Sequence, residues 1–102
     1  MGKLIEVAKT GDIETGDGIM VEVEDKSIAI FNLDGEFFAI DNTCTHRGGP
    51  LSQGDIDGDV VTCPWHGAEF NVKSGDVVSS PAPKGVSTYR VEVEGDTIKI
   101  EI

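Results

Sequence analysis

Short runs of alternating apolar and polar residues, separated by Gly- and Asp-rich turns, dominate this sequence. Alternation of this kind has the period of a β-strand with one buried face, and no long stretch shows a helical period. The pattern predicts strands at Lys3–Ala8, Ile19–Glu24, Ser27–Asn32, Glu36–Asp41, Val60–Cys63, Glu69–Asn71, Ser87–Glu94 and Thr97–Ile102. Short strands at such close spacing indicate an all-β fold, either an antiparallel sandwich or a barrel.

Two tight turns follow from the local sequence. Asp34-Gly35 lies between the apolar runs Ile28–Phe31 and Phe37–Ile40. An Asp-Gly pair readily takes the two positive φ angles of a type I′ turn, so we expect a β-hairpin here. Gly95-Asp96 stands in the same way between the last two apolar runs and is expected to close a second hairpin.

Composition and charge narrow the function classes. A chain of 102 residues with 38% hydrophobic residues has room for one folded domain and no second core. Its formal net charge of −11 disfavours nucleic acid and anionic membranes as partners, because both would repel it. The same charge favours a protein partner with a basic docking patch.

The sequence suggests where the protein works. It begins directly with an alternating run and shows no signal peptide, twin arginine or transmembrane stretch. Its two cysteines both belong to the pattern described next, which suits a reducing compartment. We therefore expect a cytoplasmic monomer that does not attach to a membrane.

Every cysteine and histidine of the chain lies in two short segments. Cys44–His46 and Cys63–His66 each offer one thiolate and one imidazole, and no Cys or His remains elsewhere. Two thiolates on one iron and two imidazoles on the other form the ligand set of one kind of [2Fe–2S] centre. The pattern therefore predicts that Cys44, His46, Cys63 and His66 bind the irons of one such cluster.

Other uses of these four residues stay open on the pattern alone. They could hold a structural zinc ion in an interaction module, although zinc sites usually pair Cys with Cys and His with His. A disulfide between Cys44 and Cys63 would need an oxidising compartment and would leave both histidines unexplained. A cluster-based redox sensor is a further possibility, although no DNA-binding element is visible in the sequence.

The full spacing, Cys44-x-His46-x16-Cys63-x-x-His66, resembles the Rieske iron–sulfur motif, and the flanking residues resemble the loops of soluble Rieske-type ferredoxins. The resemblance implies a single domain, with a sandwich or barrel base of residues 1–41 and 86–102. A smaller cluster-binding subdomain of about residues 42–85 would be inserted in this base. Pro81-Ala82-Pro83 resembles the proline-rich segment that covers the cluster in this family.

The resemblance also implies a function without catalytic residues. Soluble Rieske ferredoxins of low potential carry one electron from a flavin-dependent reductase to a terminal oxygenase, often a ring-hydroxylating dioxygenase. Carried over to this chain, transient docking would occur at the surface formed by His46 and His66. The alternative is a permanent small subunit of a larger enzyme, such as an assimilatory nitrite reductase.

Two positions depart from the quinol-oxidising Rieske proteins. Those proteins commonly carry Ser and Tyr, whose hydroxyls donate hydrogen bonds to cluster sulfur, where this chain has Ala68 and Phe70. Neither side chain can donate a hydrogen bond, and such bonds to the sulfurs control the potential. We therefore expect a midpoint near the low end of the Rieske range, about −150 mV.

Overall fold

The alternating runs form antiparallel strands in the computed structural model, which describes residues 3–43, 50–65, 67–79 and 85–101. The predicted all-β fold is therefore confirmed. The elements of these ranges, in chain order, are β1 (Leu4–Lys9), η1 (Thr10–Asp12, a 3-10 turn), β2 (Gly18–Val23), β3 (Lys26–Leu33), β4 (Glu36–Asp41), η2 (Leu51–Gln53, a 3-10 turn), β5 (Asp55–Asp57), β6 (Val60–Thr62), β7 (Glu69–Asn71), β8 (Val77–Ser79), β9 (Thr88–Tyr89), β10 (Val91–Glu94) and β11 (Thr97–Glu101).

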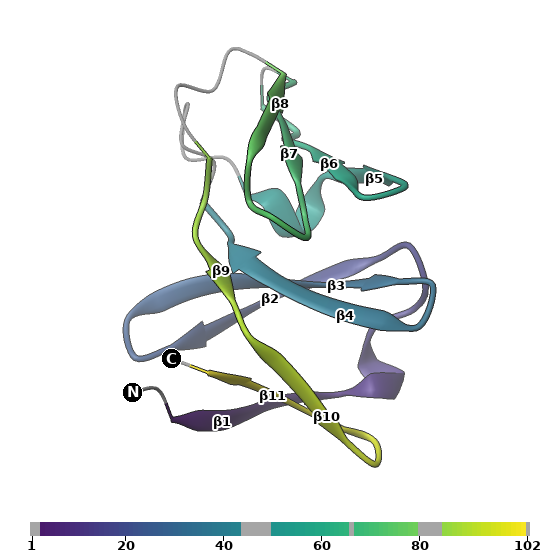
Figure 1. Ribbon diagram of the computed structural model, residues 1–102, viewed down its shortest axis with the longest axis vertical. Helices are drawn as coiled ribbons and strands as arrows, with labels where there is room; N and C mark the ends of the chain where they lie inside the picture. The colour runs from purple at the N-terminus through teal and green to yellow at the C-terminus, as the bar shows by residue number, and fades with distance from the viewer. Residues whose placement is uncertain (1–2, 44–49, 66, 80–84, 102) are drawn as a thin grey trace.

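The strands of the described residues form three sheets. The outer sheet has the order β1-β11-β10, the middle sheet β2-β3-β4-β9, and the small sheet β5-β6-β7-β8. Figure 1 shows the small sheet at the top, the middle sheet below it and the outer sheet at the bottom. The chain passes from the middle sheet into the small sheet after β4 and returns to the middle sheet at β9.

Strand β3 supplies side chains to two separate cores. Ile28 and Ile30 belong to the buried cluster that contains Ile98 and Ile100 of the outer sheet. Ala29 and Phe31 belong to a second cluster, whose other members include Leu51, Val61 and Phe70. Successive side chains of a strand point to opposite faces, so the fully buried run in β3 places the middle sheet between two cores.

The two predicted hairpins are confirmed. Asp34 and Gly35 have φ angles of 58° and 93°, as a type I′ turn requires, and Leu33 pairs with Glu36 across it. Glu94 pairs with Thr97 across the second turn.

A third two-residue turn, Glu24-Asp25 between β2 and β3, has φ angles of 49° and 69° and was not predicted. Residues other than Gly, Asn or Asp seldom adopt positive φ, so Glu24 gives no indication of this turn in the sequence.

Two strand predictions need correction. The predicted strand Ser87–Glu94 is two strands, β9 and β10, which separate at Arg90 because β9 pairs in the middle sheet and β10 in the outer sheet. Strands β5 and β8 were not predicted, because Asp55–Asp57 has a single apolar residue between two aspartates and Val77–Ser79 shows no alternation. Ile102, the predicted end of the last strand, lies outside the described residues.

Candidate metal centre

One of the four predicted ligands, Cys63, lies within the described residues. Cys44, His46 and His66 lie outside them, as does the Pro81-Ala82-Pro83 segment. The geometry below therefore concerns Cys63 and the segments that lead to and from the other predicted ligands.

Cys63 directly follows β6 and is buried, with 2% of its surface exposed. Its backbone N–H donates to the carbonyl oxygen of Ala68 at 2.7 Å, which closes the loop between β6 and β7. Its Sγ accepts the backbone N–H of Trp65 at 3.4 Å. An amide N–H directed at a buried sulfur stabilises thiolate character, so this environment fits a cysteine that binds iron.

The loop between β6 and β7 buries some of its side chains and exposes another. Thr62 and Glu69 pair at the ends of the two strands, so the loop starts and ends at adjacent points. Cys63 and Ala68 are buried at its base, whereas the Trp65 indole is 50% exposed. Gly67 has a φ angle of 76°, a conformation that favours glycine. The loop thus holds the sulfur inward while an aromatic surface faces solvent.

The segment of residues 44–49, which contains Cys44 and His46, starts and ends in a closed base. Thr43 forms an antiparallel bridge with Pro50. The backbone N–H of Leu51 donates to the carbonyl of Asn42 at 2.7 Å, and that of Ser52 to the Asn42 side-chain oxygen at 2.8 Å. This base holds together the described residues on either side of the segment.

The bases of the two ligand-bearing segments meet in one core. Leu51, which follows the first segment, and Cys63, which begins the second, belong to the same buried cluster with Ala68 and Phe70. The fold therefore brings together the bases of two segments whose predicted ligands His46 and Cys63 are separated by 16 residues. This convergence is what a cluster shared between the segments needs.

The described residues offer no competing metal site. Among them, no group of three or more His, Cys, Asp or Glu side chains gathers in a geometry suited to a metal ion.

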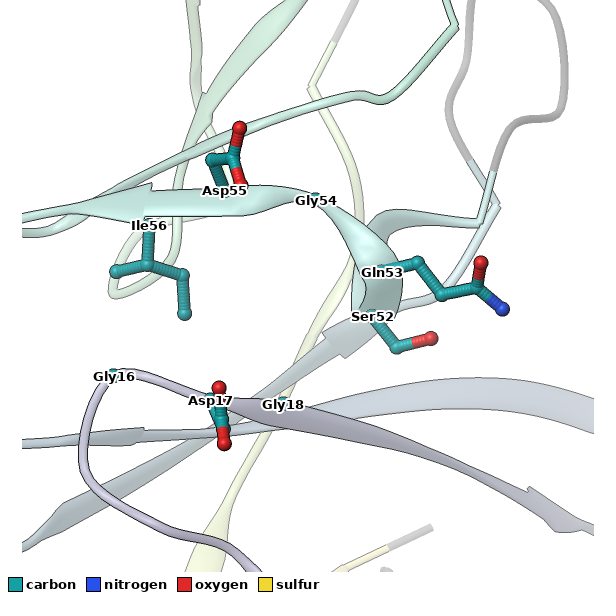
Figure 2. A pocket seen from close by; sticks show the side chains of 8 residues that line it. All are labelled: Gly16, Asp17, Gly18, Ser52, Gln53, Gly54, Asp55 and Ile56. Carbon is teal, nitrogen blue, oxygen red and sulfur yellow. The ribbon is translucent and has the colours of Figure 1, made fainter.

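A polar cavity of about 550 Å³ lies between the start of β2 and the η2–β5 segment, and its lining includes Asp17, Ser52 and Asp55 but not Cys63 (Figure 2). No helix in the described part of the chain has the length and apolarity to cross a membrane.

Sequence reasoning missed Asn42 as part of the site. Its role depends on contacts with Ser52 and Leu51, which lie across the segment from it. A polar residue directly after a predicted strand is the only indication that the sequence gives, and such residues are common in loops.

Comparison with known proteins gives a consistent result. The family model described as the Rieske [2Fe-2S] domain matches residues 3–90. The ferredoxin component of the naphthalene 1,2-dioxygenase system of Pseudomonas putida is 35% identical over 100 residues, covering 98% of this chain and 96% of that protein.

Solved structures agree with this match. A structure described as a complex of reduced oxygenase and oxidised ferredoxin in carbazole 1,9a-dioxygenase is 34% identical, with a TM-score of 0.89 and coverage of 95% and 91% of the two chains. A ferredoxin of Sphingomonas yanoikuyae B1 is 30% identical, with a TM-score of 0.91 and coverage of 98% and 99%.

Proposed function

Because this chain belongs to the Rieske [2Fe-2S] domain family, we propose that it is a low-potential carrier of single electrons with one [2Fe–2S] cluster. The proposed ligands are Cys44 and Cys63 on one iron and His46 and His66 on the other. When bound, the cluster supplies a centre that gains and loses one electron. Relatives that cover nearly the whole chain are named as ferredoxin components, which agrees with an electron carrier rather than an enzyme.

The observation that carries this proposal is the environment of Cys63. Its sulfur is buried and accepts the Trp65 N–H, and its loop shares a core with Leu51 at the base of the first ligand-bearing segment. A structural core cysteine would need no amide donor directed at its sulfur. A thiolate bound to iron benefits from one, because hydrogen bonds to sulfur tune the centre.

We also propose that residues 42–85 form the cluster-binding subdomain on a base of residues 1–41 and 86–102. Strands β5 to β8, which make up the small sheet, all lie within the first range. The strands of the outer and middle sheets lie in the other two ranges. This division supports the proposal that one compact unit holds all four ligands.

The proposed partners are a terminal oxygenase, which accepts the electron, and a flavin-dependent reductase, which donates it. The relationship to a ferredoxin chain solved with its oxygenase supports the first partner. A net charge of −11 favours transient docking to a basic surface, with association that weakens as salt rises. The proposed docking surface surrounds His46 and His66 and includes the exposed Trp65 indole.

Low-temperature EPR of the dithionite-reduced protein, with iron and zinc analysis, tests the cluster. We expect about two irons per chain and a rhombic spectrum whose average g value lies below that of all-cysteine clusters. Substitution Cys63→Ser should remove the signal, whereas Ser74→Ala, at an exposed turn, should retain it. A colourless protein that contains zinc would contradict the proposal.

A second experiment tests the carrier role. Reduced protein is mixed with a ring-hydroxylating oxygenase at increasing salt, and its reoxidation is followed by stopped flow. We expect reoxidation that slows as salt rises. A protein that stays in permanent complex with a larger enzyme after purification would instead favour the fixed-subunit alternative.

A further inference from the structure

Asp41, the last residue of β4, contacts both chain connections between the middle sheet and the small sheet. Its carboxylate accepts the backbone N–H of Ser87 through Oδ2 at 3.2 Å and the Tyr89 hydroxyl through Oδ1 at 2.6 Å. Its own backbone N–H donates to the Ser87 carbonyl at 2.9 Å. Asp41 leads into the outgoing connection, whereas Ser87 and Tyr89 belong to the returning one, so one residue ties the two together.

The backbone pairing at this point is short, which gives the side chain a larger role. Strands β4 and β9 pair at two positions, Ala39 with Tyr89 and Ile40 with Thr88. At Ser87 the next N–H is accepted by a carboxylate oxygen of Asp41 rather than by a backbone carbonyl. Hydrogen bonds to an ionised acceptor are stronger than neutral ones, so the carboxylate extends a weak ladder.

The returning connection is also held at the small sheet. The Val86 N–H donates to the Gly75 carbonyl at 2.8 Å, in the turn between β7 and β8. A Cβ at Gly75 would collide with the Val86 carbonyl, and one at Gly85 with the Gly75 carbonyl. Residues 85–89, here called the strap, are therefore held by Gly75 at one end and by Asp41 at the other. Figure 1 shows the strap running from the small sheet down across β4.

We propose that Asp41 is a positioning residue that fixes the strap against the end of β4, and so sets the spacing of the two described connections between the middle sheet and the small sheet. Residues 44–49 follow Asp41, and residues 80–84 lead into the strap that its carboxylate holds. The inference rests on the proposed function, in which both segments belong to the cluster-binding subdomain of residues 42–85. Loss of the carboxylate lets the strap separate from β4, which opens the site to solvent and chelator.

Three substitutions separate position from charge. Asp41→Ala removes both side-chain bonds, whereas Asp41→Asn removes the same charge but keeps one acceptor for Ser87 and one donor for the Tyr89 oxygen. Tyr89→Phe keeps the charge and the ring, over which the Lys26 ammonium lies 5.6 Å from the centroid, and removes the hydroxyl alone.

Asn32→Ala is the matched control. Asn32 is 7% exposed and makes two side-chain bonds, donating to the Ile13 carbonyl and accepting the Gly35 N–H. Both bonds lie outside the strap and the two connections. The variant therefore loses the same number of side-chain hydrogen bonds as Asp41→Ala, elsewhere in the molecule and at a more buried position.

The measurements are iron release to bathophenanthroline, the midpoint potential, and hydrogen exchange of the Ser87 amide. Losing one hydrogen bond raises local opening about fivefold, so Asp41→Ala should release iron at least about fivefold faster and exchange Ser87 faster. Asp41→Asn should stay within about twofold of the original chain, and Tyr89→Phe should lie between them. The potentials of Asp41→Ala and Asp41→Asn should differ, although both lack the charge.

The outcomes are distinguishable. If the unsubstituted protein shows no [2Fe–2S] EPR signal, the proposed function is wrong and the positioning role fails with it. If the signal is present but Asp41→Ala releases iron no faster than Asn32→Ala, the positioning role alone is overturned. Equal effects of Asp41→Ala and Asp41→Asn on iron release and potential would assign the effect to charge, which also overturns it.

Discussion

The side-chain oxygen of Asn42 accepts the backbone N–H of Ser52 at 2.8 Å, across the segment that contains Cys44 and His46. Asn42 and Ser52 are 8% and 9% exposed, so this bond is buried. A buried N–H that loses its acceptor destabilises the folded state, because it has given up its hydrogen bond to water without gaining another. The bond is therefore a sensitive point at the base of a proposed ligand segment.

Asn42→Ala should lower the free energy of unfolding by about 1–3 kcal/mol, because the Ser52 N–H loses its acceptor. Chemical denaturation monitored by circular dichroism measures the change. Ser74→Ala is the matched control, since the Ser74 hydroxyl accepts the Asp76 N–H in an exposed turn. That variant should stay within about 0.5 kcal/mol of the original protein. Equal stability of the two variants would contradict the role given to Asn42.

Gly54→Ala should destabilise the protein by about 1–3 kcal/mol through overpacking. Gly54 lies between η2 and β5, and a Cβ there would collide with the carbonyl oxygen of Thr62 and lie 3.0 Å from a methyl carbon of Val61. Gly11 provides the comparison, because a Cβ there would meet no atom within 4 Å. Thermal unfolding should show a clear loss for Gly54→Ala and little change for Gly11→Ala.

Tyr89 should give the protein a pH-dependent loss of stability in strong alkali. Burial, the hydrogen bond to Asp41 and the Asp41 charge raise its pKa to about 12, from an ordinary value of 10.0. A raised pKa means that the folded state holds the proton more tightly than the unfolded state. The stabilisation is therefore complete below pH 10 and disappears as the pH rises towards 12.

Tyr89 is the single tyrosine of the chain, so the tyrosinate absorbance near 295 nm reports it alone. We expect the folded protein to titrate well above a denatured sample, and Asp41→Asn to titrate at lower pH because the carboxylate charge is gone. A titration midpoint near 10 in the folded protein would show that Asp41 does not hold the hydroxyl.

Ala68→Ser should raise the midpoint potential of the cluster. Ala68 is fully buried, and its carbonyl accepts the Cys63 N–H, so its side chain lies beside the base of the sulfur loop. A hydroxyl that donates to sulfur stabilises the reduced, more negative state. A shift of about 60 mV corresponds to a tenfold change for a one-electron couple.

Spectroelectrochemical titration measures this potential, starting from an expected value of about −150 mV. Ala39→Ser is the control, because Ala39 is also buried, at 2% exposure, but in the core against the outer sheet. That variant should lose stability without moving the potential. An unchanged potential in Ala68→Ser would mean that the added hydroxyl does not reach the cluster.

The parts of the fold that depend on local sequence could be predicted. Asp34-Gly35 fixes its turn through backbone preference, and Glu36–Asp41 has the same bounds in the prediction and in the structure. The division at Arg90 could not be predicted, because it depends on which sheet each half joins. Alternation indicates that one face of a strand is buried, but it does not indicate which element packs against that face.

In the candidate site, too, some residues could be predicted from the sequence and others could not. The four proposed ligands could be identified from residue types and spacing, because the two segments contain every Cys and His of the chain. The roles of Asn42 and Asp41 could not be predicted, because their hydrogen-bond partners lie ten and more than forty residues away in the sequence. Polar residues after a strand are common, and their tertiary partners cannot be inferred from sequence alone.

The pairing of β1 with β11 has a practical consequence. These strands lie side by side in the outer sheet, with Leu4 opposite Glu101, on the far side of the middle sheet from the small sheet (Figure 1). A tether attached to the outer sheet therefore lies on the opposite side of the middle sheet from the small sheet. Attachment to a solid support or to a fusion partner through β1 or β11 therefore leaves the small sheet, which belongs to the proposed cluster-binding subdomain, free to face a second protein.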